Sequence, residues 1–182
     1  MKNMLWRMKQ LNIIFNERRG DMFTFFKNKE VNTLYAPISG KKIAIEKVDD
    51  PLFSKEMLGA SVAFLPSKDC VVSPCVGEIT MITPTLHACG IQTKDGMEIL
   101  IHIGIDSVML KGKGFKTLCH VGDHVEIGTP LIQCDFSMMK DNHIDTTVIM
   151  IITNSKDYQL SLDKDEKKVI SGKTKLGEGV KC

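Results

Sequence analysis

The chain has 182 residues and a formal net charge of +2, from 24 basic and 22 acidic side chains. This length is sufficient to bury a hydrophobic core, and it favours a single domain. The near balance of charge excludes the strongly basic class of protein that binds nucleic acid through its phosphates, so no nucleic acid is expected as a partner. No apolar run in the sequence approaches the roughly 20 residues that a membrane-spanning helix needs.

Residues 1–30 differ in character from the rest of the chain. On a helix, apolar Trp6 and Phe15 with basic Lys2 would form a weakly amphipathic segment suited to an anionic membrane surface. The simpler interpretation, which we favour, is a flexible N-terminal leader. The string at 17–21 directly precedes Met22, and its purine-rich codons resemble a bacterial ribosome-binding site. We therefore expect Met22 to be the natural start.

From position 31 onwards the sequence is typical of short strands separated by Pro, Gly and Asp. The expected strands cover 31–34, 42–48, 58–66, 79–83, 89–93, 97–106, 121–135 with a turn at 128–130, and 146–153. One short helix is expected at 137–143, capped by Ser137. The fold class is therefore all-β, an antiparallel β-sandwich or barrel with at most short helical turns. Residues 31–172 are expected to form this domain, and 173–182 a mobile tail.

Two pairs of short patterns recur along the chain. Ala36-Pro37-x-x-Gly40 is repeated by Ser73-Pro74-x-x-Gly77, and each pattern leads into an alternating apolar strand. Likewise, 58–62 is repeated by 121–125. Such pairs indicate an internal duplication of one small β unit.

Cysteine usage indicates a reducing compartment. The six cysteines include no Cys-x-x-Cys pair, and nothing resembling a secretory signal precedes them. We expect reduced thiols, several of them packed in the core. They are Cys70, Cys75, Cys89, Cys119, Cys134 and Cys182.

The strand at 97–106 carries an ionisable ring in an otherwise apolar run. Because side chains alternate along a strand, the residues from Met97 to Ile105 at odd positions form a core face. His102, Gly104 and Asp106 fall on the other face. Gly104 leaves backbone open beside the ring, so its carbonyl is placed to orient the imidazole and set its tautomer. His102 is therefore the leading candidate for chemistry.

A second histidine is expected beside the first. If Asp95-Gly96 is a two-residue hairpin turn, Cys89 opposes His102, and His87 falls just beyond the paired end. Thr85 is placed to hydrogen-bond the far nitrogen of His87. Two adjacent imidazoles suit a zinc site or a phosphohistidine carrier. A His-x-His pair, which would support catalytic zinc, is missing; the other histidines, His120, His124 and His143, are expected to be solvated.

The pattern His102-Ile-Gly-Ile-Asp106-Ser-Val-x-Leu-x-Gly-x-Gly-Phe115, with Thr85-x-His87 upstream, is specific. It resembles the glucose-type enzyme IIA domain of the bacterial phosphoenolpyruvate-dependent sugar phosphotransferase system. The likeness runs over residues 31–155 and more loosely to 179. The resemblance implies an antiparallel β-sandwich built from a duplicated hybrid motif. Two departures are Ser107, where this family usually has Thr, and Leu86, which replaces a more polar residue.

The resemblance also implies a function. In this family His102 would accept a phosphoryl group from the histidine-containing phosphocarrier protein and pass it to a cysteine of a sugar-specific IIB domain. The chain would thus be a cytoplasmic phosphotransferase, peripheral to the membrane permease, that needs no cofactor. Its further partners would be regulated permeases or kinases, and a zinc ion could bridge His87 and His102 at such an interface.

The resemblance assigns roles to individual residues as well. His87 would bind the phosphate, Thr85 would orient His87, and the Gly104 carbonyl would hold the other nitrogen of His102. Asp106 and Asp50 would meet arginines of the carrier protein. The apolar contacts would come from Phe53, Val108 and Met109.

Three alternatives use the same residues differently. A regulatory binding protein would keep the fold without transfer activity. A zinc-dependent hydrolase of the lysostaphin-like kind would need the His-x-His that is missing. A biotinyl or lipoyl carrier would need an exposed lysine at a hairpin tip, for which Lys140 is a poor candidate.

Overall fold

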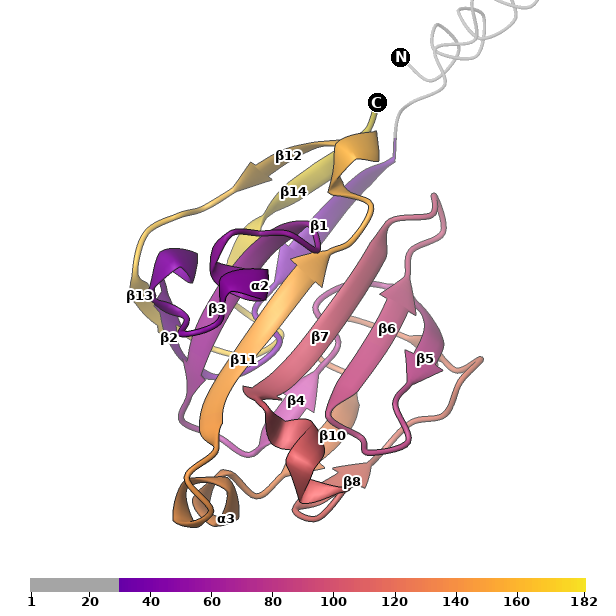
Figure 1. Cartoon of the computed structure of the whole chain (residues 1–182). Helices are drawn as coiled ribbons and strands as arrows, with labels where there is room; N and C mark the ends of the chain where they lie inside the picture. Colours follow the sequence, from indigo (N-terminus) through magenta and orange to yellow (C-terminus); the bar gives the residue numbers. More distant parts are fainter. Residues whose placement is uncertain (1–29) are drawn as a thin grey trace, which may run out of the picture.

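The computed structural model describes residues 30–182 and consists mainly of antiparallel strands (Figure 1). The strands are β1 Val31–Tyr35, β2 Gly40–Ile43, β3 Ala60–Pro66, β4 Cys70–Val72, β5 Gly77–Ile82, β6 Ala88–Gln92, β7 Glu98–Ile105, β8 Phe115–Thr117, β9 His124–Val125, β10 Pro130–Cys134, β11 Asp145–Ile152, β12 Tyr158–Leu162, β13 Lys167–Val169 and β14 Lys175–Lys181. The helical turns are short: η1 Ile45–Lys47, α2 Pro51–Ser54, η2 Ser107–Leu110, α3 Phe136–Asp141 and η3 Ser155–Asp157. The expected all-β class is confirmed. Residues 1–29 of the predicted leader, and with them the expected start at Met22, lie outside the described residues.

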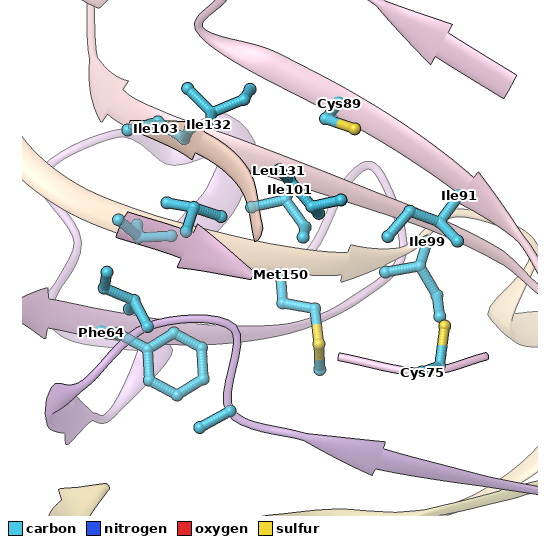
Figure 2. Packing of buried hydrophobic residues seen from close by; sticks show 14 of the residues in the cluster. Phe64, Cys75, Cys89, Ile91, Ile99, Ile101, Ile103, Leu131, Ile132 and Met150 are labelled. Atoms are coloured by element: carbon cyan, nitrogen blue, oxygen red, sulfur yellow. The ribbon is translucent and has the colours of Figure 1, made fainter. Parts of the chain in front are cut away.

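The strands form one large sheet and two small ones that pack as a sandwich. The large sheet has the order β13-β2-β3-β11-β7-β6-β5-β9, and the small sheets are β1-β14-β12 and β4-β10-β8. Figure 1 shows the small sheets behind the large one. The main core fills the space between them, where Phe64, Ile101 and Met150 of the large sheet meet Leu131 and Ile132 of β10 (Figure 2). Aliphatic burial on this scale is the main source of stability.

A second, smaller core covers the outer face of the large sheet. Phe53 of α2 packs there with Val48, Ile105 and two isoleucines of β11, Ile149 and Ile151. Strand β11 is therefore buried on both faces, which explains why its sequence is an almost unbroken apolar run rather than an alternating one. This outer core lies on the same face of the large sheet as the His102 ring, which contacts Phe53.

The duplication expected from the repeated patterns appears in the backbone hydrogen bonds. The amide of Tyr35 donates to the Pro74 carbonyl, and the equivalent amide of Val72 donates to the Pro37 carbonyl, both over 2.8 Å. Each repeat thus bonds to the other in the same way. The amides of Gly172 and Gly128 likewise donate to the carbonyls at equivalent positions of the two repeats, Ala36 and Ser73, over 2.9 Å.

The β6–β7 hairpin differs by one residue from its expected register. His102 opposes Ala88, not Cys89. The loop contains three residues, because the Thr93 amide donates to the Met97 carbonyl and Gly96 has φ +94°. A three-residue loop with a glycine in the left-handed region is a common hairpin connection. His87 still falls just before the strand, as predicted.

The predicted core face of β7 is correct except at its last residue, Ile105. Met97, Ile99, Ile101 and Ile103 contribute to the main core, but Ile105 packs in the outer one. The alternation breaks at Gly104, whose φ is +78°, next to an irregularity in the pairing with β11. A residue with positive φ turns the chain out of the strand, so the faces exchange.

The short helix α3 starts before its predicted position. It begins at Phe136, and Asp135 caps it by accepting the Met138 amide over 2.8 Å. Ser137, the expected cap, lies inside the helix. An ionised carboxylate is a stronger acceptor than a hydroxyl for these first amides, which accounts for the choice.

The mobile tail expected after position 173 is wrong. Residues 175–181 form β14, the middle strand between β1 and β12. Gly177 and Gly179 both lie in this strand, and Leu176 is 1% exposed. The middle strand of a small sheet is held by pairing on both sides, which the local sequence does not reveal.

None of the six cysteines is in a disulfide, and four of them are buried, as predicted. Within residues 30–182, no helix is long and apolar enough to cross a membrane.

The role of β14 can be tested by a single truncation of its buried side chain. Leu176→Ala should lower the free energy of unfolding by about 2–4 kcal/mol, because the lost contacts leave a cavity in the main core. Val31→Ala removes an exposed apolar side chain from the neighbouring strand and should change stability by less than about 0.5 kcal/mol. Urea unfolding measures both, and equal values would contradict the structure.

Candidate functional site

His102 lies within β7, and β7 lies between β11 and β6 (Figure 1). It opposes Ile149 on one side and Ala88 on the other. Its ring is half-buried on the outer face, where its centroid is 4.9 Å from that of Phe53 at an interplanar angle of 44°. Packing against an aromatic ring and between two paired strands leaves the imidazole little freedom to rotate.

Gly104 supplies a backbone acceptor for the His102 ring. At φ +78° its carbonyl accepts a hydrogen bond from the imidazole. A side chain at this position is excluded, because its Cβ would lie 2.8 Å from the Asp145 carbonyl oxygen and would also clash with Met139. The hydroxyl of Ser107 donates to the Ile103 carbonyl over 2.5 Å and lies 3.1 Å from the Gly104 carbonyl. The expected orienting role of Gly104 thus has a structural basis.

His87 lies beside His102, although it is outside the paired strands. The Ile103 amide donates to the His87 carbonyl over 2.8 Å, which extends the hairpin contact by one residue. The two imidazole centroids are 5.3 Å apart, with ring planes at 83°. An edge of one ring therefore faces the other, and the expected pairing of the two histidines is present.

Two threonine hydroxyls meet the Nδ1 atom of His87. Thr85 Oγ1 lies 2.6 Å away, as the sequence predicted, and Thr83 Oγ1 lies 3.3 Å away. The sequence reasoning missed Thr83. Its position two residues before Thr85 was the available signal, but Leu86, at φ +58°, introduces a turn that brings both hydroxyls to one nitrogen.

Burial keeps both imidazoles neutral. It is the largest influence on His102, whose pKa is lowered from 6.5 to about 4, and neighbouring His87 lowers that pKa further. The Gly104 carbonyl, Asp50 and Asp106 oppose the shift, because they favour a positive ring. Burial also lowers the pKa of His87. At neutral pH the pair therefore presents uncharged nitrogens, the form in which an imidazole is a nucleophile.

Two carboxylates lie near the pair, and two exposed apolar side chains follow one of them in the chain. Asp50 caps α2 by accepting the Leu52 amide over 2.7 Å. Asp106 precedes η2 in a left-handed conformation, and its side chain is exposed. In η2, Val108 and Met109 are 48% and 71% exposed. That these four residues meet a partner stays a prediction.

Phe53 occupies a different position from the one expected. It is only 4% exposed, so it offers little surface to a partner. Its ring instead packs against His102 and joins the outer core. We therefore assign it a packing function beneath the imidazole rather than a place in the apolar contact surface.

Among residues 30–182, no group of three or more His, Cys, Asp or Glu side chains is placed to hold a metal ion. His120, His124 and His143 are exposed, as predicted. Lys140 lies in α3 rather than at a hairpin tip, which a biotinyl or lipoyl carrier would require.

Known proteins are similar to this chain both in sequence and in fold. The family model described as "phosphoenolpyruvate-dependent sugar phosphotransferase system, EIIA 1" matches residues 32–158. The chain is 38% identical over 155 residues to the PTS system glucose-specific EIIA component of Staphylococcus epidermidis, with 84% of this chain and 93% of the relative covered. The protein of the same name from Staphylococcus aureus is 38% identical over 156 residues, with the same coverage.

A solved structure agrees with these relatives. Glucose permease IIA from Mycoplasma capricolum superimposes with a TM-score of 0.73 at 30% identity, covering 86% of this chain and 99% of that one. The sandwich fold and these sequence matches thus define the class, the phosphocarrier proteins of sugar transport. The chain belongs to the EIIA 1 family of the phosphoenolpyruvate-dependent sugar phosphotransferase system.

The lowered pKa of His102 predicts a pH dependence of stability. Between about pH 6.5 and 4 the unfolded chain binds a proton at His102 while the folded protein does not, so the free energy of unfolding decreases as the pH falls. From pH 7 to 4.5 this contribution is about 2 kcal/mol at 1.36 kcal/mol per pKa unit. In His102→Gln the loss of stability over this interval should be smaller by about that amount.

Urea unfolding of both proteins at the two pH values measures the effect. His124→Gln, a substitution at an exposed histidine, is the matched control and should behave like the unmodified protein. An equal loss of stability in His102→Gln and in the unmodified protein would show that the folded protein does not keep His102 neutral.

Proposed function

We propose that His102 accepts a phosphoryl group from the histidine-containing phosphocarrier protein and passes it to a cysteine of a sugar-specific IIB domain. The observation that carries this proposal is a neutral, half-buried imidazole held by the Gly104 carbonyl with a second imidazole at its edge. Phosphoryl transfer needs little covalent chemistry from the protein beyond a nucleophile, positioning and donors for the phosphoryl oxygens.

In the proposed transfer, His102 is the nucleophile and His87 binds the phosphoryl oxygens. In His102, Nδ1–H, at the nitrogen near the backbone, donates a hydrogen bond to the Gly104 carbonyl and keeps its proton, so the free lone pair is on Nε2. Nε2 forms a bond to phosphorus as the N–P bond of the donor breaks, and the donor nitrogen keeps that electron pair. Nε2–H of His87 donates to a phosphoryl oxygen. In the second transfer a cysteine thiolate attacks phosphorus, and the electron pair of the N–P bond returns to Nε2 of His102.

The surroundings of the pair suit a basic partner. Asp50 and Asp106 would pair with arginines of the phosphocarrier protein, while the exposed side chains of Val108 and Met109 would provide an apolar contact. A small apolar surface with acidic groups around it favours rapid and reversible association, because charge attraction accelerates encounter without making the complex long-lived. Rapid release is required of a protein that passes a group between two partners.

The proposed transfer needs no cofactor. Its proposed location is the cytoplasm, beside the membrane permease. The covalently bound phosphate is the only group carried. Regulation through the same face is the second candidate function, because a permease or kinase that covered the two imidazoles would compete with the carrier. A zinc ion there would find two imidazole ligands, and a partner carboxylate would have to supply the third.

Labelling by the upstream enzymes tests the acceptor residue. Incubation with phosphoenolpyruvate, enzyme I and the carrier protein should yield an acid-labile, base-stable phosphate on the protein. His102→Ala should abolish this label, because the nucleophile is gone, whereas His124→Ala, at an exposed histidine far along the chain, should retain it. Label that persists in His102→Ala would disprove the proposed acceptor.

The function of His87 is tested by separating acceptance from onward transfer. In His87→Gln the nucleophile remains, so phosphate should still be accepted on His102. Transfer to the IIB domain should be slower by about 100-fold or more, because the imidazole that supports the phosphoryl oxygens is lost. Single-turnover measurements of both steps distinguish them, and normal onward transfer would remove His87 from the mechanism.

A further inference from the structure

Ser107 is a buried polar residue to which the proposed transfer gives no task. It is 0% exposed, and it begins η2 directly after Asp106. Its hydroxyl lies 2.5 Å from the Ile103 carbonyl oxygen and 3.1 Å from the Gly104 carbonyl oxygen. Because a carbonyl oxygen can only accept, the hydroxyl is the donor in both contacts, and the shorter distance directs its proton mainly at Ile103.

The two carbonyls belong to the residues that hold the histidine pair. The amide of Ile103 donates to the His87 carbonyl over 2.8 Å, so Ile103 ties the backbone of His87 to β7. The Gly104 carbonyl accepts a hydrogen bond from the His102 imidazole. The Ser107 hydroxyl therefore lies where the support of one imidazole meets the support of the other.

The same hydroxyl closes a turn of unusual backbone shape. Ile103 and Ser107 are four residues apart, and between them Gly104 has φ +78° and Asp106 has φ +56°. A left-handed residue other than glycine is uncommon and persists where its surroundings hold it. A Cβ on Gly104 would lie only 3.0 Å from the Cβ of Ser107, so the serine also packs directly against this glycine.

We propose that Ser107 is a positioning residue for the transfer, whose hydroxyl holds the turn 103–107 in the shape that directs the Gly104 carbonyl at the His102 ring. The inference rests on the proposed transfer at His102 and extends it. A ring held in one orientation keeps its free nitrogen in line with phosphorus, and a small misplacement of a reacting atom slows such a step strongly. Since none of its surface is exposed, Ser107 acts through Gly104 rather than through a partner.

Phosphoryl acceptance from the purified, phosphorylated carrier protein tests the inference. In Ser107→Ala the rate at saturating carrier should fall roughly 10- to 100-fold, because the ring is no longer held for attack. The carrier concentration that gives half of this rate should stay the same, since the docking surface is intact. Ser107→Thr keeps the hydroxyl and should retain the rate of the unmodified protein. An unchanged saturating rate in Ser107→Ala, or a loss confined to carrier affinity, would refute the inference.

Ser73→Ala is the matched structural control. Ser73 is also 0% exposed, and its hydroxyl donates to the Cys75 carbonyl over 2.7 Å, but it lies between β4 and β5. This substitution also removes a buried hydroxyl that bonds to a carbonyl, and it should leave the saturating rate unchanged. An equal loss of rate in Ser73→Ala would mean that general destabilisation slows the transfer, and it would overturn the assignment of Ser107.

A second variant covers the case in which Ser107→Ala does not fold. Ser107→Cys replaces the hydroxyl by a thiol, which fills the site but is a weak donor, and it should show the same loss of rate. A normal rate in the folded Ser107→Cys protein would contradict the proposed positioning. An unmodified protein that takes no phosphate refutes the proposed function, whereas a labelled protein with equal rates in all serine variants refutes this inference alone.

Discussion

The left-handed backbone at Gly104 is the constraint on which the site depends. It ends the regular alternation of β7, so that Ile105 joins the outer core while the Gly104 carbonyl reaches the His102 ring. It also starts the turn that presents Asp106 to solvent. Met139 and the Asp145 carbonyl fill the space where a side chain would be, so the conformation is held by packing and not only permitted by glycine.

Burial rather than charge prepares the imidazole for chemistry. His102 has two carboxylates in its surroundings, which on their own would raise its pKa, yet the neutral form dominates because the ring is packed between Phe53 and His87. The same carboxylates are then available to a basic partner. In the proposed transfer, an imidazole that packing already holds in one orientation suits a protein that meets two partners in succession.

Two threonine hydroxyls lie near one nitrogen of His87 because of a local turn in the backbone. Leu86 adopts a positive φ that an aliphatic residue rarely takes, and this places Thr83 and Thr85 on one nitrogen. Such local strain persists because Leu86 packs against the main core. A functional arrangement is thus stabilised by packing that has no chemical function itself.

The sequence by itself determined the all-β class, the pairing of His87 with His102 and the position of Gly104 beside the His102 ring. Alternation and turn residues are local signals, so these features can be predicted from short segments. Tertiary structure decided the one-residue register of the hairpin, the exchange of faces at Gly104, the burial of Phe53 and the incorporation of 175–181 as a middle strand. Each of these depends on which distant segment fills a space or completes a hydrogen-bond ladder. Such choices are made by packing across the sandwich, which no local pattern specifies.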